Sequence, residues 1–202
     1  MKIYLAFDTE TTGLINYDKE LSDPSQPRIT QLAAMLVDEN HKLLDEMSVY
    51  IKPDGWTVPE EITKLNGTTT EMLEEKGIPM VDALRRFNEM KAQCTDRIGH
   101  NISFDKQMLA REAMAYGLDH NSEGLGTICT MKMTRDICKL PPTAKMKGNG
   151  FKPPKLQEAY THFFGEEFPN SHDAMADVIA CLKVFFTAKK HLEAQPQEGE
   201  AA

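Results

Sequence analysis

Three stretches in the first quarter of the chain carry the hydrophobic patterns of β-strands. Residues 3–10 (IYLAFDTE) combine β-branched and aromatic side chains, and no strand-breaking residue follows until Gly13, which indicates a buried strand. Residues 29–38 and 43–52 form two further strand-like runs, joined by a short polar segment. Because strands joined by short connections pair with each other, we expect these three to form an antiparallel meander.

Beyond the third strand the apolar positions recur at helical spacing. A short helix is expected over residues 60–65, ended by Gly67, and a longer one over residues 80–93. Residues 97–101 (RIGHN) are expected to form a short strand. A helix then follows from 103 to 116, with a serine at its start that can cap it.

The last third of the chain is patterned less regularly. Residues 127–138 suit a strand or a helix, a loop follows, and helices are expected over 155–164 and over about 172–192. Strands followed by alternating helices and strands predict an α/β fold, with a sheet of about five strands and helices on its faces. We expect one domain over residues 1–192 and a disordered C-terminal tail over 193–202, which lacks periodicity and bulky side chains.

Composition narrows the class of protein. The chain has 202 residues and a formal net charge of −8, whereas proteins that coat nucleic acid are usually strongly basic. A nuclease is compatible with this acidity, since carboxylates that hold divalent cations contribute to it. No apolar run approaches the ~20 residues that span a bilayer, and acids occur too early for a signal peptide. We therefore expect a cytoplasmic protein with no membrane partner.

Asp8 and Glu10, in the motif FDTETTGL at residues 7–14, end the first predicted strand. Side chains alternate along a strand, so these two carboxylates point to the same face and can hold one cation between them. The alternative is a strand end with solvated acids. The strongly apolar strand before the pair and the Thr-Thr-Gly turn after it favour a ligand site.

Two later motifs supply further acids. GHNISFDKQML (99–109) delivers Asp105 to the first turn of a helix, where a carboxylate could also simply complement the helix dipole. SHDAMADVIAC (171–181) places His172 at a helix start and Asp177 about a turn and a half later. Asp177 could be a surface acid. Its apolar neighbours, however, make an unpaired carboxylate costly there, and a bound metal would remove that cost.

Together these motifs, which span nearly the whole chain, resemble those of the DnaQ-like (DEDDh) 3′→5′ exonucleases of the RNase H-like superfamily. The segments RITQLAAMLVD and KLQEAYTHFFG also look like family elements. The resemblance implies an RNase H-like mixed sheet of five strands, an antiparallel meander plus parallel strands, flanked by helices. It also implies a catalytic set of four acidic metal ligands and one histidine: Asp8, Glu10, Asp105, Asp177 and His172.

The chemistry that the resemblance implies is phosphodiester hydrolysis with two divalent ions, Mg²⁺ or Mn²⁺, which suit a shell of oxygen ligands. Asp8 would bridge both ions, Glu10 and Asp177 would complete one, and Asp105 would hold the other through water. His172 would deprotonate the attacking water. The expected activity is release of nucleoside 5′-monophosphates from the 3′ end of a strand, with single-stranded DNA as the expected substrate.

Substrate contacts are expected beside the motifs and in a basic segment. The residues expected to seat the terminal nucleotide are Thr9, Thr11, Leu14 and, by resemblance, Glu61, Asn66 and Phe104. For the leucine and the phenylalanine a place in the core is the alternative. Between residues 136 and 158 the chain has no acid but several lysines, among prolines and glycines that prevent regular structure. We interpret this segment as a loop that grips phosphates through Lys145, Lys147 and Lys152, with a solvated linker as the alternative.

Two other functions fit the same sequence. An RNA-trimming exoribonuclease would share the site and differ in substrate, because recognition of the 2′-OH depends on small contacts that the sequence does not place. A non-catalytic domain that binds nucleic acid or a partner would share the fold, although the presence of all five site residues argues against it. A polymerase or repair partner is compatible with the sequence but is not required by it.

Overall fold

The computed structural model describes residues 1–118, 120, 123–144, 146 and 150–194. Its strands form one sheet in the order β3-β2-β1-β4-β5. Neighbours β1–β2 and β2–β3 are antiparallel, whereas β1–β4 and β4–β5 are parallel. The predicted mixed sheet, a meander plus parallel strands, is therefore confirmed. The strands are β1 (Ile3–Thr11), β2 (Ile29–Asp38), β3 (Leu43–Tyr50), β4 (Asp96–Gly99) and β5 (Gly126–Cys129).

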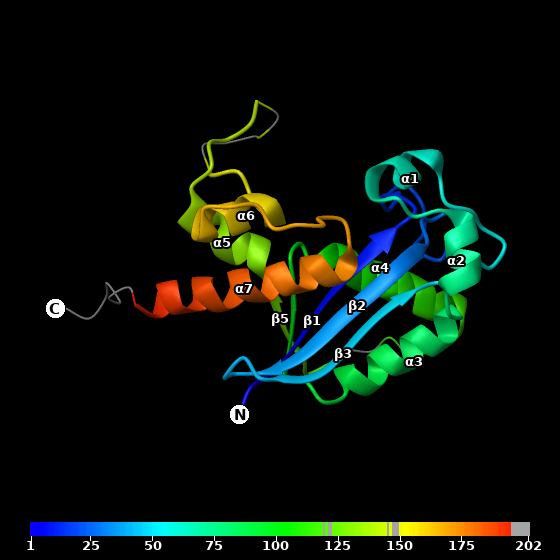
Figure 1. Cartoon of the computed structure of the whole chain (residues 1–202), viewed down its shortest axis with the longest axis horizontal. Helices are drawn as coiled ribbons and strands as arrows, with labels where there is room; N and C mark the ends of the chain where they lie inside the picture. Colours follow the sequence, from blue (N-terminus) through cyan, green and yellow to red (C-terminus); the bar gives the residue numbers. More distant parts are fainter. Residues whose placement is uncertain (119, 121–122, 145, 147–149, 195–202) are drawn as a thin grey trace.

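Helices flank this sheet, and Figure 1 shows α7 lying across the strands with α5 and α6 beside it. In the described part of the chain they are α1 (Glu60–Asn66), α2 (Thr70–Lys76), α3 (Met80–Lys91), α4 (Ser103–Ala115), α5 (Thr130–Cys138), α6 (Leu156–Phe164) and α7 (Ala174–Glu193). The sequence pattern did not mark α2, whose first turn is capped by a threonine hydroxyl. Residues 127–138, which suit a strand or a helix, contain both.

Side-chain alternation along β1 divides the core into two layers. Leu5 and Phe7 pack in a cluster with residues of α3 and α4, whereas Tyr4 and Ala6 pack with residues of α7. Burial of a large side chain such as Phe7 contributes roughly 1.5–3 kcal/mol, so both layers hold the strand firmly. The same alternation directs the even-numbered acids at the end of β1 toward α7.

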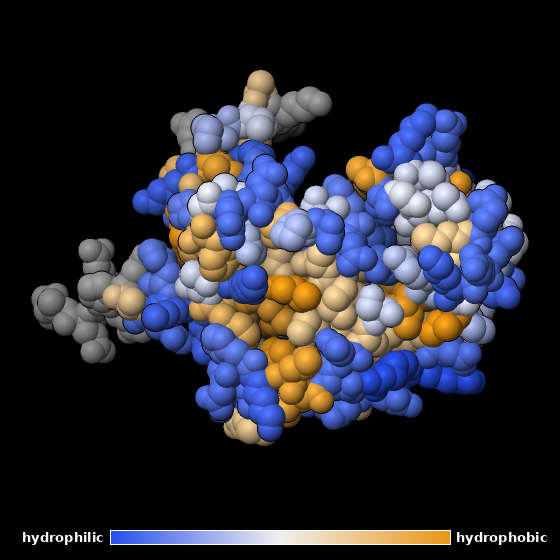
Figure 2. Space-filling model, viewed as in Figure 1, coloured by the Kyte–Doolittle hydropathy of each residue, from blue (hydrophilic) through white to orange (hydrophobic). Residues whose placement is uncertain are grey.

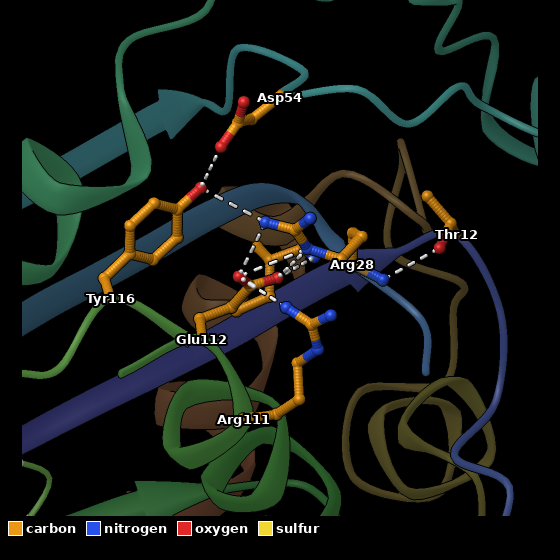
Figure 3. Close-up of polar contacts among 7 residues, drawn as sticks. Thr12, Arg28, Asp54, Arg111, Glu112 and Tyr116 are labelled. Carbon is orange, nitrogen blue, oxygen red and sulfur yellow. Dashed lines mark hydrogen bonds and ion pairs between the residues drawn. The ribbon is translucent and has the colours of Figure 1, made fainter. Parts of the chain in front are cut away.

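A buried polar network joins the start of β2 to α4 (Figure 3). The carboxylate of Glu112, which is fully buried, accepts hydrogen bonds from Arg28 at 3.0 Å and from Arg111 at 3.1 Å. It also accepts the backbone N–H of Ile29 at 3.1 Å. The hydroxyl of Tyr116 accepts a further bond from Arg28 at 3.2 Å. Every charge at this point of the core thus has a partner.

The surface of the α7 side includes an apolar groove of about 510 Å³ between the β2–β3 hairpin and helices α6 and α7. Figure 2 shows the apolar side chains that gather on this face. Within the described residues, no helix is both long and apolar enough to cross a membrane. Helix α7 extends one residue into the predicted tail, and residues 195–202 of that tail lie outside the described part. The single-domain boundary at residue 192 stays a prediction.

Candidate active site

The end of β1 carries two of the predicted acids. Asp8 and Glu10 follow a run of fully buried residues and lie opposite Ala33 and Gln31 of β2. Their carboxylates point to the α7 side, as the strand period predicts. Carboxylate oxygens of Asp8, Glu10 and Asp177 all lie within 4.8 Å of one another. The structure therefore brings the first and third sequence motifs together.

Local hydrogen bonds fix the start of α7 at this place. Asp173 caps the helix by accepting N–H groups of its first turn. Gln31, which lies opposite Glu10 in the sheet, donates its amide N–H to the Asp173 carboxylate at 3.0 Å and accepts the N–H of Ala174 at 3.2 Å. This clamp holds the first turn of α7 beside the end of β1, so that Asp177 faces the acids of that strand.

Asp105 reaches the site from α4, in the layer that α3 and α4 form on the other face of the sheet. It is the third residue of α4, which begins at Ser103 without a side-chain cap, so the serine is not the cap that the sequence suggested. The Asp105 carboxylate is almost fully buried and accepts the backbone N–H of Thr9 at 3.1 Å and the Thr9 hydroxyl at 2.8 Å. Because Thr9 lies between the two acids of β1, these bonds hold Asp105 close to both.

Burial, together with repulsion between neighbouring carboxylates, raises the pKa values of the four acids. Burial raises the pKa of Asp8 well above its usual range, and the neighbouring carboxylates of Asp105, Asp177 and Glu10 raise it further. Burial likewise raises the pKa of Asp177 to about 7, and that of Asp105 to about 7 against the opposing hydrogen bonds from Thr9. Burial also raises the pKa of Glu10.

This arrangement fits a divalent cation. Among the described residues no Lys or Arg forms an ion pair with any of the four acids. Buried carboxylates without cations are costly, and a bound ion removes that cost by favouring their charged form. The donors are all carboxylate oxygens, which hard ions such as Mg²⁺ and Mn²⁺ prefer.

His172 lies at the edge of this cluster. It precedes the cap of α7, so it is not the first helical residue, and its backbone is left-handed with φ 73°. Its N–H donates to the Asp177 carboxylate at 3.3 Å. The imidazole is exposed and lines the same cleft as the four acids. A side chain in this position can reach water and substrate.

The acids open into a cleft of about 460 Å³. Thr9, Thr11, Leu14 and Phe104 line it, as the sequence suggested. Leu14 is 85% exposed, so the alternative of a place in the core is wrong for it. Phe104 lines the cleft and also packs against the core. The sequence analysis missed five further lining residues: Gly13, Ile62, Leu65, His100 and Asn101.

The other predicted contacts stand apart from the cleft wall. Asn66 donates to the Glu10 carboxylate at 3.3 Å, so it contacts an acid of the site. Glu61 is exposed in the first turn of α1. Lys152 forms an ion pair with Glu158. Lys145 and Lys147 lie outside the described residues.

His100 connects the cleft to the segment before α6. Its Nε2 lies 2.9 Å from the carbonyl oxygen of Pro154, which can only accept, so Nε2 carries the proton. Nδ1 then accepts from the hydroxyl of Thr130 at 2.9 Å. Burial lowers the pKa of His100, which favours this neutral ring. His100 therefore fixes the position of Pro154, near the end of the basic segment.

Known proteins resemble this chain in sequence. A DNA polymerase III subunit epsilon-like protein of Rhodobacter capsulatus is 23% identical to this chain, over 95% of the chain and 24% of that protein. Three-prime repair exonuclease 1 of Bos taurus is 25% identical, over 88% of the chain and 60% of that protein. The chain thus spans less than two thirds of the length of these relatives.

Solved structures agree on the fold. Exonuclease I of E. coli, in a complex with a dT13 oligonucleotide, superposes with a TM-score of 0.72 at 21% identity, over 96% of this chain and 43% of the other. A family model described as RNase_T, Exonuclease, matches residues 5–185, which include all four acids and His172. The predicted DnaQ-like resemblance is confirmed, and this chain belongs to the RNase_T exonuclease family.

Proposed function

We propose that this chain is a metal-dependent 3′→5′ exonuclease that hydrolyses single-stranded DNA and releases nucleoside 5′-monophosphates. One observation carries the proposal: three carboxylates lie with oxygens within 4.8 Å of one another, in a cleft that Asp105 and His172 also line. The names of the comparison proteins support polarity and substrate, since the bovine relative is a three-prime repair exonuclease and the E. coli structure holds a dT13 strand.

In this proposal Asp8, Glu10, Asp105 and Asp177 hold two divalent ions. Bound ions of this kind neutralise charge at the phosphate and lower the pKa of water. The chain's own contribution is placement. Thr9 keeps Asp105 in position through two hydrogen bonds, and the cap at the start of α7 keeps Asp177 in position.

His172 acts as the general base in the proposed reaction. A ring nitrogen of its neutral imidazole accepts the proton of the attacking water. Its exposed position on the cleft wall supports this role, because the ring can reach a water near the scissile phosphate and then return the proton to solvent. The backbone bond from His172 to Asp177 ties the base to the acidic cluster.

The cleft wall suits the base and sugar of a terminal nucleotide. Leu14 is a large apolar residue that is 85% exposed beside the acids, and Leu65 of α1 is 54% exposed on the same cleft. Phe104 adds an aromatic ring, on which a base can stack without regard to sequence. Thr9 and Thr11 bring polar groups to the same wall. Glu61 and Asn66 stay proposed contacts of the strand.

The basic segment is proposed to hold the incoming strand through phosphate contacts of Lys145, Lys147 and Lys152. The link from His100 to Pro154 supports this, since it places the end of the segment beside the cleft. Replacing the three lysines with Gln should raise KM, leave kcat nearly unchanged and flatten the salt dependence by about 0.7 per lost contact on single strands. Because Lys152 already pairs with Glu158, the Lys145→Gln and Lys147→Gln changes should carry most of this effect.

A time course on matched 5′-labelled DNA and RNA oligonucleotides tests the function. With Mg²⁺ or Mn²⁺ the labelled strand should shorten stepwise from its 3′ end, and EDTA should stop the reaction. Immediate release of the label as a mononucleotide would reverse the polarity. Faster loss of RNA would identify an exoribonuclease, and no cleavage with either ion would leave a non-catalytic domain. A polymerase or repair partner is a separate proposal, supported by the name of the R. capsulatus relative.

A further inference from the structure

A further cavity lies apart from the acidic cleft, in the layer between the sheet and helices α3 and α4. It measures about 220 Å³ and lies among β1, β4, α3 and α4. It shares no lining residue with the cleft. Its apolar wall includes Phe7, Leu84 and Leu109, and its polar side chains come from Asn88 and from four basic residues: Lys91, Arg97, Lys106 and His120.

Arg97 occupies a core-facing position of β4. Its neighbour Ile98 packs with α7, so the alternation of the strand turns Arg97 toward α3 and α4, next to Leu5 of β1. The residue is 5% exposed and forms no ion pair among the described residues. One of its terminal nitrogens donates to the Thr127 hydroxyl at 3.1 Å, but its buried Nε has no hydrogen-bond partner among the described residues. A buried guanidinium with so few partners is costly.

Lys106 brings a second positive charge to the same wall. It is half-buried on α4 and has no ion-pair partner among the described residues. Burial lowers the pKa of Lys106, and repulsion from Arg97 lowers it further. No described lining residue is acidic, although the whole chain has 31 acids against 23 lysines and arginines. The cavity therefore concentrates positive charge in an acidic protein.

We propose that this cavity is an anion site that binds one phosphate group, carried by inorganic phosphate or by a nucleoside monophosphate. A guanidinium fork matches phosphate oxygens, and an ammonium adds a point charge. The volume lies below the roughly 300–1,000 Å³ of drug-sized ligand sites, so it suits a single phosphate and not a strand. The nucleotide source rests on the proposed function, whose product is such a monophosphate; the inorganic source does not.

Calorimetric titration of the full chain tests the site. EDTA keeps divalent ions from the acidic cleft, and the ionic strength is held constant with NaCl. The probes are inorganic phosphate, deoxyadenosine monophosphate and deoxyadenosine. We expect saturable binding of a phosphate-bearing probe to the wild type and to Asp8→Asn, and no binding of deoxyadenosine. Tighter binding of the monophosphate than of phosphate would assign the nucleotide as the ligand, and the reverse would assign free phosphate.

Matched variants locate the binding. Lys106→Gln should weaken it at least tenfold, whereas Lys132→Gln, an exposed lysine on α5, should leave it unchanged. Arg97→Met should abolish it and, because it removes a buried charge that has no counterion among the described residues, should raise the melting temperature in phosphate-free buffer. Should Arg97→Met fail to fold, Lys106→Gln decides alone. Absence of binding by the wild type, or equal binding by Lys106→Gln and the wild type, would overturn the proposal. Neither outcome depends on exonuclease activity.

Discussion

Glu112 and the acids of the cleft show two ways in which this chain buries carboxylates. Glu112 is fully buried and is matched by Arg28, Arg111 and a backbone N–H (Figure 3). Asp8 and Asp177, within reach of Glu10, have carboxylates as neighbours and no ion-pair partner among the described residues, and burial and repulsion raise their pKa values. The first arrangement stabilises the fold without any ligand. In the second, burial and repulsion disfavour the charged form, which a bound cation would favour.

Asp8→Asn should produce the largest effect, because it removes a central member of the unbalanced cluster. We expect hydrolysis to fall more than about a thousandfold, which corresponds to roughly 4 kcal/mol of transition-state stabilisation. In EDTA the variant should melt above the wild type, since a buried carboxyl group that is costly to charge is gone. Initial rates on labelled DNA and thermal unfolding measure both. Asp136→Asn, at an exposed acid of α5, is the control. Activity within tenfold of the wild type would remove Asp8 from the metal site.

Glu112→Gln should have the opposite effects, a loss of stability without a loss of activity. It leaves Arg28 and Arg111 buried without a carboxylate, so the free energy of unfolding should fall by about 3–5 kcal/mol, as for other broken buried pairs. The folded variant should keep the wild-type kcat. Urea titration gives the stability. Glu193→Gln, which breaks an exposed pair with Lys189, should cost at most about 1 kcal/mol. An equally small loss for Glu112→Gln would show that the buried network contributes no more to stability than an exposed ion pair does.

His172→Ala should lower the rate of hydrolysis without affecting the binding of metal ions. Loss of a general base should lower kcat by about a hundredfold or more. Binding of Mn²⁺ should persist, because the four carboxylates remain. Steady-state kinetics and calorimetric titration with Mn²⁺ measure the two properties, and His162→Ala, at an exposed histidine of α6, is the control. Loss of Mn²⁺ binding together with turnover would make His172 a metal ligand.

The pH dependence of stability in the absence of metal reports on the charge of the acids in the cleft. With EDTA present, Asp105 and Asp177 keep protons up to about pH 7 in the folded state, whereas the unfolded chain releases them near 3.8. Their contribution is therefore fully present below about pH 4 and is lost as pH rises toward 7, by roughly 1.4 kcal/mol per pKa unit for each group.

Divalent ions should remove this loss because they favour the charged acids. The rise in melting temperature caused by Mg²⁺ should accordingly be larger at pH 8 than at pH 5, and Asp177→Asn should show a shallower pH slope in EDTA. Thermal unfolding across this pH range measures both quantities. An equal effect of Mg²⁺ at the two pH values would show that the acids are already charged in the folded protein.

The sequence by itself determined the parts of the site that depend on short spacing. The period of a strand placed Asp8 and Glu10 on one face, and helical spacing put Asp177 about a turn and a half after His172, near the start of the last helix. The resemblance added the set of five residues across the chain. The antiparallel meander also followed, because strands joined by short connections pair with each other, and the resemblance added the parallel strands.

Only the tertiary structure decided which distant residues meet. Arg28 and Glu112 are 84 positions apart, and neither shows its partner in any local pattern. Leu65 is an apolar residue that is 54% exposed, and its place on the cleft wall depends on where α1 packs. Arg97 looks like an ordinary basic residue on a short strand until the register of β4 turns it into the core. These contacts depend on the packing of whole elements, which periodicity along one segment does not encode.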